Sequence, residues 1–216
     1  GVEIVNDDFK IFTIKGGQNY SCDVYHIERD WSSASCWLVA AALGHGIVVK
    51  GLNLESLQAD VALLDALNSA NCMISLDDDI LLIDGEERVP FKFDATHCPD
   101  LFPALVTFAA FCDGVSMIKG VHRLAAKESD RGLALQEEFC LLGLKIDLEE
   151  DVMIIHGGTP LNSAIVDAHN DHRIAMCLAI AGSFIEGGVT IKGAESVAKS
   201  YPGFWDDLES LKVEEE

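Results

Sequence analysis

Three short segments of the chain resemble one another, and their spacing constrains the fold more than any other feature. They read GIVVKG at 46–51, GVSMIKG at 114–120 and GVTIKG at 188–193. Lys119 follows Lys50 by 69 residues, and Lys192 follows Lys119 by 73 residues. Each segment is rich in β-branched residues and bounded by glycine, which is typical of a short strand. A period of about 70 residues predicts one structural unit that occurs three times.

Helix-like and strand-like runs recur around these segments in the same order. Apolar runs of helical length precede them at 33–43, 100–111 and 172–185. Further helical runs follow them at 54–70, 129–142 and 202–211. Paired short strands come next in the first two copies, at 72–76 with 80–83 and at 144–148 with 152–156. Alternating strands and helices predict an α/β fold. One unit cannot bury its apolar face alone, so we expect the three copies to share one core.

Residues 1–28 lie outside the repeat and contain two strand-like runs, 2–5 and 9–14. We expect them to be a remnant of a neighbouring domain, and residues 29–216 to form the domain of repeats. The sequence begins with Gly1 rather than methionine, which indicates a piece of a longer protein.

Composition excludes several classes of function. The 216 residues include 15 Lys and Arg against 36 Asp and Glu, a formal net charge of −21. Such a chain disfavours nucleic acid and anionic membranes as partners, because both require basic surfaces. No apolar run is long enough for a transmembrane helix, and no secretory leader is visible. The seven cysteines contain no C-x-x-C pair, so we expect reduced thiols and a cytoplasmic protein.

Polar residues open the first helix of each repeat, and basic residues cluster near the second repeat. Asp30, Asp100 and Asp171 stand where helix caps are expected. One interpretation is a structural role, in which these residues only cap their helices. The alternative is that three helix N-termini converge and bind an anion. Four of the 15 cations fall between 119 and 131, where they form either a solvated helix face or a ligand loop.

A metal site is the weaker interpretation of His169 and His172. No acidic or cysteine ligand recurs at matching spacing. The adjacent Arg173 suits a phosphate group better than a metal cation. We therefore expect no metal.

Five motifs, in order along the chain, carry a resemblance to a known family. They are DWSSAS at 30–35, HCPD at 97–100, KESDR at 127–131, NDHRIAM at 170–176 and AKSYP at 198–202. Together they resemble the 5-enolpyruvylshikimate-3-phosphate (EPSP) synthase family, the 3-phosphoshikimate 1-carboxyvinyltransferases of aromatic amino acid biosynthesis. The resemblance implies βαβαββ units around a pseudo-threefold axis, an inside-out α/β barrel, with one domain and a remnant of the second present here.

The resemblance also implies an activity and its partners. The family transfers the enolpyruvyl group of phosphoenolpyruvate to the 5-hydroxyl of shikimate 3-phosphate, without metal or cofactor, and releases phosphate. Both substrates are anions, which agrees with clustered cations in an acidic chain. The remaining partner is a missing amino-terminal half of the same enzyme, so we expect these 216 residues to be inactive alone.

The matching motifs imply roles for seven residues. Asp100 resembles the base on the 5-hydroxyl, Lys127 a contact of shikimate 3-phosphate that also takes part in proton transfer, and Glu128 the acid for carbon 3. Arg131, Arg173 and Lys199 resemble the clamp on phosphoenolpyruvate. Arg123 stands where some members have Asn, which weakens its expected contact with shikimate 3-phosphate. We also expect Asp100 to stay ionised, because Lys127 is close.

Two other functions stay open at this point. UDP-N-acetylglucosamine enolpyruvyl transferase shares the implied fold and phosphoenolpyruvate, although the motifs at 127–131 and 170–176 favour the shikimate enzyme. A non-catalytic anion-binding domain is the second alternative.

Overall fold

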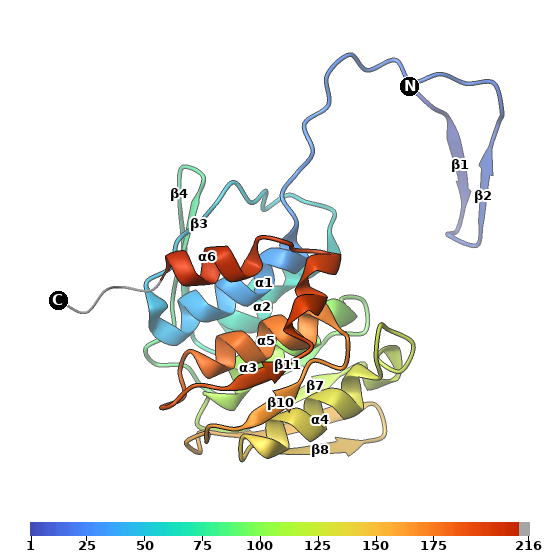
Figure 1. Ribbon diagram of the computed structural model, residues 1–216. Coiled ribbons are helices and arrows are strands. Elements are labelled where there is room, and N and C mark those ends of the chain that lie inside the picture. Colours follow the sequence, from blue (N-terminus) through green and yellow to red (C-terminus); the bar gives the residue numbers. More distant parts are fainter. Residues whose placement is uncertain (212–216) are drawn as a thin grey trace.

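Three helices form the centre of the protein. The computed structural model describes residues 1–211, and in it α1 (Trp31–Ala40), α3 (Phe102–Ala110) and α5 (His172–Gly182) contact one another in the middle of the body (Figure 1). All nine residues of α3 and ten of the eleven in α5 are buried. Helices that are apolar on every side belong inside a core. The expected shared core is therefore confirmed.

The second repeat is a complete βαβαββ unit around α3. It runs through β6 (Lys92–Asp94), α3, β7 (Gly114–Lys119), α4 (Arg131–Leu141), β8 (Lys145–Glu149) and β9 (Val152–Gly157). The sheet order is β6-β7-β9-β8, with β6 parallel to β7 and the other pairs antiparallel.

The first repeat has a smaller sheet and a shorter outer helix than expected. Its strands β3 (Val49–Lys50), β5 (Ile80–Asp84) and β4 (Met73–Asp77) pair antiparallel in that order. The expected helix at 54–70 is only α2 (Leu63–Ser69), preceded by the 3-10 turn η2 (Ala59–Ala62). The prediction is wrong over 54–58 because this loop binds the start of α1. The side chain of Gln58 accepts from Trp31 N–H and donates to the Arg29 carbonyl.

The third repeat contains β10 (Ile165–Asp167), α5, β11 (Thr190–Lys192) and α6 (Phe204–Ser210). Its sheet has two strands, which pair parallel. Beside it lies an apolar groove of about 830 Å³, lined among others by Trp37, Ile180, Val189, Ile191 and Trp205.

The second and third repeats match in strand register and hydrogen bonds at an offset of 73 residues. Lys92 pairs with Met117 and Ile165 with Thr190 in equivalent registers. Ala95 N–H donates to Lys119 O at 2.9 Å, and its equivalent Ala168 N–H donates to Lys192 O at 2.9 Å. This agreement confirms the repeat and the α/β class.

The remaining helical elements are short: the π-helical η1 (Ala41–His45) and the 3-10 turns η3 (Pro99–Leu101), η4 (Val121–Arg123) and η5 (Ala194–Lys199). Within residues 1–211, no helix combines the length and the apolar character that crossing a bilayer requires. All seven cysteines carry free thiols, and five of them are buried.

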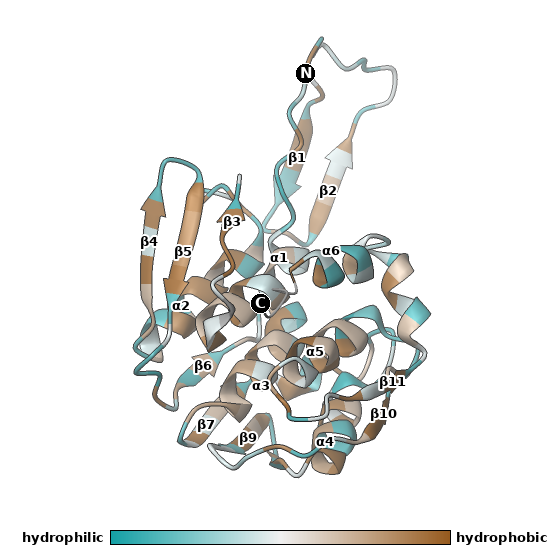
Figure 2. Cartoon of the chain, turned by 60° about the vertical axis from the view of Figure 1, so that its left-hand side comes forward, coloured by the Kyte–Doolittle hydropathy of each residue, from teal (hydrophilic) through white to brown (hydrophobic). Residues whose placement is uncertain are grey.

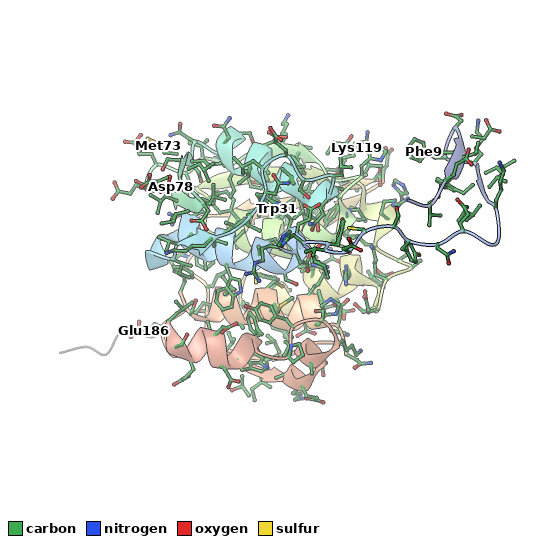
Figure 3. All side chains as sticks on the ribbon, turned by 90° about the horizontal axis from the view of Figure 1, so that it is seen from above. Phe9, Trp31, Met73, Asp78, Lys119 and Glu186 are labelled. Carbon is green, nitrogen blue, oxygen red and sulfur yellow. The ribbon has the colours of Figure 1, made fainter. Side chains whose placement is uncertain are left out.

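A hairpin precedes the body. The strands β1 (Ile4–Asp7) and β2 (Ile11–Ile14) pair antiparallel and confirm the two strands expected there. In Figures 1 and 2 they stand clear of the helices, and Figure 3 places Phe9, at the hairpin turn, far from Trp31 in the body. Both strands carry apolar side chains that are more than half exposed, such as Ile11 and Phe12.

Candidate functional site

The N-terminal ends of the three central helices meet, as the anion-binding interpretation requires. Asp30 caps α1 by accepting from Ser32 and Ser33 N–H, and Asp171 caps α5 by accepting from Arg173 N–H. The third end is η3, which leads into α3 after Cys98. Three helix N-termini at one place favour negative charge there.

Equivalent positions in the three repeats form the middle of this site. Ser32, Asp100 and Arg173 each lie two residues after the N-cap of their helix, which is Asp30, Cys98 or Asp171. Arg173 Nη1 donates to Ser32 O at 3.3 Å, and Arg173 Nε lies 3.8 Å from Asp100 Oδ1. The repeat thus brings together the backbone carbonyl of Ser32, the carboxylate of Asp100 and the guanidinium of Arg173.

Arg131 is the charged centre of the site. It is the first residue of α4, and its side chain is fully buried. Its guanidinium donates to Asp171 Oδ2 at 2.7 Å, to Asp100 Oδ1 at 2.6 Å and to Glu128 Oε2 at 2.6 Å. Burial acts to lower the pKa of Arg131, but the carboxylates outweigh it, so the pKa lies above its usual value. Arg131 is therefore a permanent cation.

The other two repeats bury apolar residues at the position of Arg131. The first residue of α2 is Leu63 and the first residue of α6 is Phe204, and both are fully buried. The fold thus requires a buried side chain at this position but no charge. The charge at this position is therefore specific to the second repeat, where carboxylates surround Arg131.

Asp100 lies between cations. Lys127 Nζ donates to Asp100 Oδ1 at 2.9 Å, beside the bond from Arg131. Burial acts to raise the pKa of Asp100, but Lys127, Arg173 and Arg131 outweigh it and hold the pKa below its usual range. The prediction that Asp100 is ionised beside Lys127 agrees with this geometry. An ionised carboxylate that is one-third exposed can accept a proton from a ligand.

Lys199 and Arg123 lie farther from Asp100 than Lys127 and Arg131 do. Lys199 Nζ donates to the carbonyl of Asn170, the residue before Asp171. Arg123 belongs to η4 and is exposed, and within residues 1–211 the structure gives it no ion pair to the cluster. The structure therefore brings Lys127, Glu128, Arg131 and Arg173 around Asp100, places Lys199 at the rim and leaves Arg123 outside.

Asp60 is a residue of the site that no sequence motif predicts. It is buried in η2, and its carboxylate accepts from the hydroxyl of Ser32. Burial raises the pKa of Asp60, and Ser32 and Arg173 offset part of that effect. Only the folding of the loop before α2 against α1 brings it here.

The two histidines considered as metal ligands do not share a partner. His169 Nε2 lies 2.7 Å from Glu138 Oε1, whereas Nδ1 of His172 is buried without a partner in the described residues. Burial and the neighbouring Arg173 lower the pKa of His172, so it is neutral at pH 7. Glu137, Glu138 and His169 have potential ligand atoms within 4.8 Å of one another, but this grouping lies away from Asp100.

Comparison with known proteins identifies the family. The model of the family described as EPSP synthase (3-phosphoshikimate 1-carboxyvinyltransferase) matches residues 1–208. The chain belongs to the EPSP synthase family. It is 41% identical over 211 residues to the 3-phosphoshikimate 1-carboxyvinyltransferase of Clostridium acetobutylicum, and 39% identical over 213 residues to that of Clostridium botulinum. A solved EPSP synthase structure from Acinetobacter baumannii superposes with a TM-score of 0.83 at 25% identity.

These matches cover most of this chain but only part of its relatives. They span 98% of this chain and 49% of each clostridial sequence, and 52% of the Acinetobacter chain. The chain thus spans about half the length of the relatives that it matches. The expected architecture, repeated units of an EPSP synthase-like domain, is confirmed.

Proposed function

We propose that this chain supplies one half of an enzyme that transfers the enolpyruvyl group of phosphoenolpyruvate to the 5-hydroxyl of shikimate 3-phosphate. The observation that carries the proposal is the cluster of Asp100, Lys127, Arg131 and Arg173 at the meeting point of three helix N-termini. Membership of the EPSP synthase family supports the reaction. Both substrates are anions, and arginine forks match carboxylate and phosphate groups.

The residues of this half divide into two groups in the proposed reaction. Arg173 and Lys199 hold phosphoenolpyruvate, together with Arg131 once it exchanges its partly exposed partner Glu128 for the ligand. Lys127 contacts shikimate 3-phosphate and takes part in proton transfer. Asp100 accepts the proton of the 5-hydroxyl as its oxygen bonds to carbon 2, and Glu128 supplies the proton that carbon 3 receives. In the elimination, the Glu128 carboxylate takes a proton back from carbon 3 as the bond between carbon 2 and the phosphate oxygen breaks, and phosphate leaves. Positioned acids and bases of this kind contribute about 10²–10⁴-fold.

The second half of the enzyme is the proposed partner. The exposed apolar strands β1 and β2, and the apolar groove beside β11, are surfaces of this chain that a further part of the enzyme would cover. In this proposal residues 1–28 belong to the other domain and residues 29–216 form this one. We expect no transferase activity from the 216 residues alone, because half of the substrate contacts are absent.

The alternative enzyme and the binding domain make different predictions. UDP-N-acetylglucosamine enolpyruvyl transferase would accept UDP-N-acetylglucosamine in place of shikimate 3-phosphate. A non-catalytic anion-binding domain would turn over neither in the full-length protein. The names of the clostridial relatives favour the shikimate substrate.

The deciding experiment replaces Asp100 in the full-length enzyme. Asp100→Ala should lower kcat by about 10²–10⁴-fold, because it removes the proposed base. The KM for phosphoenolpyruvate should change far less. Asp147→Ala, which removes a carboxylate of the outer strand β8 that pairs with Lys145, is the control. Equal loss in kcat and in binding would remove Asp100 from the role of base.

A further inference from the structure

Glu138 is a buried carboxylate that none of the roles above uses. It lies on α4, two turns beyond Arg131, and is 5% exposed. Its Oε2 accepts from Asp167 N–H at 2.8 Å, and its Oε1 lies 2.7 Å from His169 Nε2. A carboxylate is placed in such a site only with partners for its oxygens, and here each oxygen has one.

The two partners of Glu138 are Asp167, the last residue of β10, and His169 in the turn between β10 and α5. Within this turn His169 N–H donates to Asp167 Oδ1 at 2.8 Å, and Asp171 N–H donates to Ala168 O at 2.8 Å. His169 and Asn170 have φ values of 50° and 54°, in the left-handed region that side chains other than glycine adopt rarely. A turn with two such residues in succession persists when its surroundings hold it.

The equivalent turn of the second repeat shows what Glu138 adds. There Thr96 N–H donates to Asp94 Oδ1 at 3.0 Å, and Cys98 N–H donates to Ala95 O at 3.1 Å. These bonds match those of the third repeat, but Thr96 and its successor do not have positive φ. Among the hydrogen bonds of the described chain, no glutamate from a neighbouring helix holds that turn.

The turn that Glu138 holds delivers three groups to the anion site. The carbonyl of Asn170 accepts from Lys199, the carboxylate of Asp171 pairs with Arg131, and Arg173 follows in the first turn of α5. Helix α4 therefore contacts the turn at both ends, through Arg131 at one end and Glu138 at the other. The second contact fixes the direction in which the turn leaves β10.

We propose that Glu138 is a positioning residue for phosphoenolpyruvate binding. By holding Asp167 and His169, it sets the turn that orients Asp171 against Arg131 and keeps Lys199 and Arg173 at the site. The proposal rests on the proposed function for the identity of the ligand, and on the hydrogen bonds of Glu138 for the positioning itself.

The test compares three variants of the full-length enzyme. Glu138→Ala removes both contacts and should raise the KM for phosphoenolpyruvate at least tenfold, with a smaller fall in kcat. Glu138→Gln should restore most of the affinity, because its amide oxygen can accept from Asp167 N–H and its amino group can donate to a neutral His169. Glu137→Ala changes the exposed neighbour on the same helix and should behave as wild type.

A second measurement separates positioning from the proposed function. In the isolated chain, amide hydrogen exchange at Asp167 should accelerate in Glu138→Ala and stay slow in Glu138→Gln. His169→Gln, which changes only one of the two contacts, serves if Glu138→Ala does not fold, and it should give a smaller rise in KM. If wild type does not use phosphoenolpyruvate, the proposed function fails while the exchange data still test the hold on the turn.

Three results would overturn the proposal. The first is a folded Glu138→Ala enzyme with unchanged KM. The second is a loss of thermal stability in Glu138→Ala with wild-type kinetics at low temperature, which would mean a structural role only. The third is an equal effect of Glu137→Ala, which would point to the acidity of this face rather than to the hold on the turn.

Discussion

The second and third repeats share one plan and finish it differently. Both build a parallel strand pair and a buried helix in the same register. In the second repeat β9 and β8 extend the sheet to four strands; in the third, β11 keeps an open edge beside the apolar groove. The helix tips that carry Asp100 and Arg173 form in both, although Asp171 caps α5 with its side chain and η3 leads into α3 without a side-chain cap. The site end is therefore present in both repeats, whereas the far end differs by two strands.

The outer helices α4 and α6 of the same two repeats differ in their first residue. Phe204 opens α6 in the third repeat, and Arg131 opens α4 in the second, both fully buried. Phe204 packs with Trp37, Tyr201 and Trp205, whereas Arg131 pairs with carboxylates. The buried first position of the outer helix is therefore apolar in the third repeat and charged in the second, where carboxylates of the candidate site surround it.

The largest expected effect comes from making the second repeat like the others at this position. Arg131→Leu should lower the free energy of unfolding at pH 7 by about 3–5 kcal/mol, because it leaves Asp171 buried without its cation. Urea unfolding monitored by circular dichroism measures the loss.

The double variant Arg131→Leu with Asp171→Asn sharpens this result. Asparagine retains a capping oxygen for α5 and removes the unpaired charge, so at least half of the lost stability should return. A loss below about 1 kcal/mol in Arg131→Leu alone would mean that the ion pairs add little at this position.

A smaller effect distinguishes the closed sheet from the open one. Ile118 on β7 is fully buried and pairs with Met153 of β9, whereas its equivalent, Ile191 on β11, is half-buried and lines the groove. Ile118→Ala should cost about 2–5 kcal/mol. Ile191→Ala should cost roughly 1 kcal/mol, because folding removes less of the apolar surface of this side chain from water. Equal losses in urea unfolding would contradict the open state of the third sheet.

The sequence predicts the parts of this fold that carry local signals. The glycine-bounded strands around Lys50, Lys119 and Lys192 and the apolar central helices are found where expected. The strands β6 and β10 have three residues each, too few for an alternating pattern. The helix expected at 54–70 is shortened because Gln58 binds the start of α1, a contact across 27 residues that no local pattern contains.

The candidate site divides in the same way. Motifs identify Asp100, Lys127, Arg131 and Arg173, and the structure brings all four together. The partners Asp60 and Glu138 come from elements 28 and 31 residues away from Ser32 and His169, so only the tertiary fold reveals them. Local signals thus indicate which residues act on a ligand, and long-range contacts determine which residues hold them.

If three helix tips and the adjacent basic side chains form one anion site, a titration of phosphoenolpyruvate into the isotope-labelled chain will locate it. In nuclear magnetic resonance spectra, the largest amide shifts should fall at Ser32, Asp100 and Arg173, and added salt should reduce them. Shifts that cluster elsewhere on the protein, or an absence of shifts at these tips at millimolar ligand, would contradict the account.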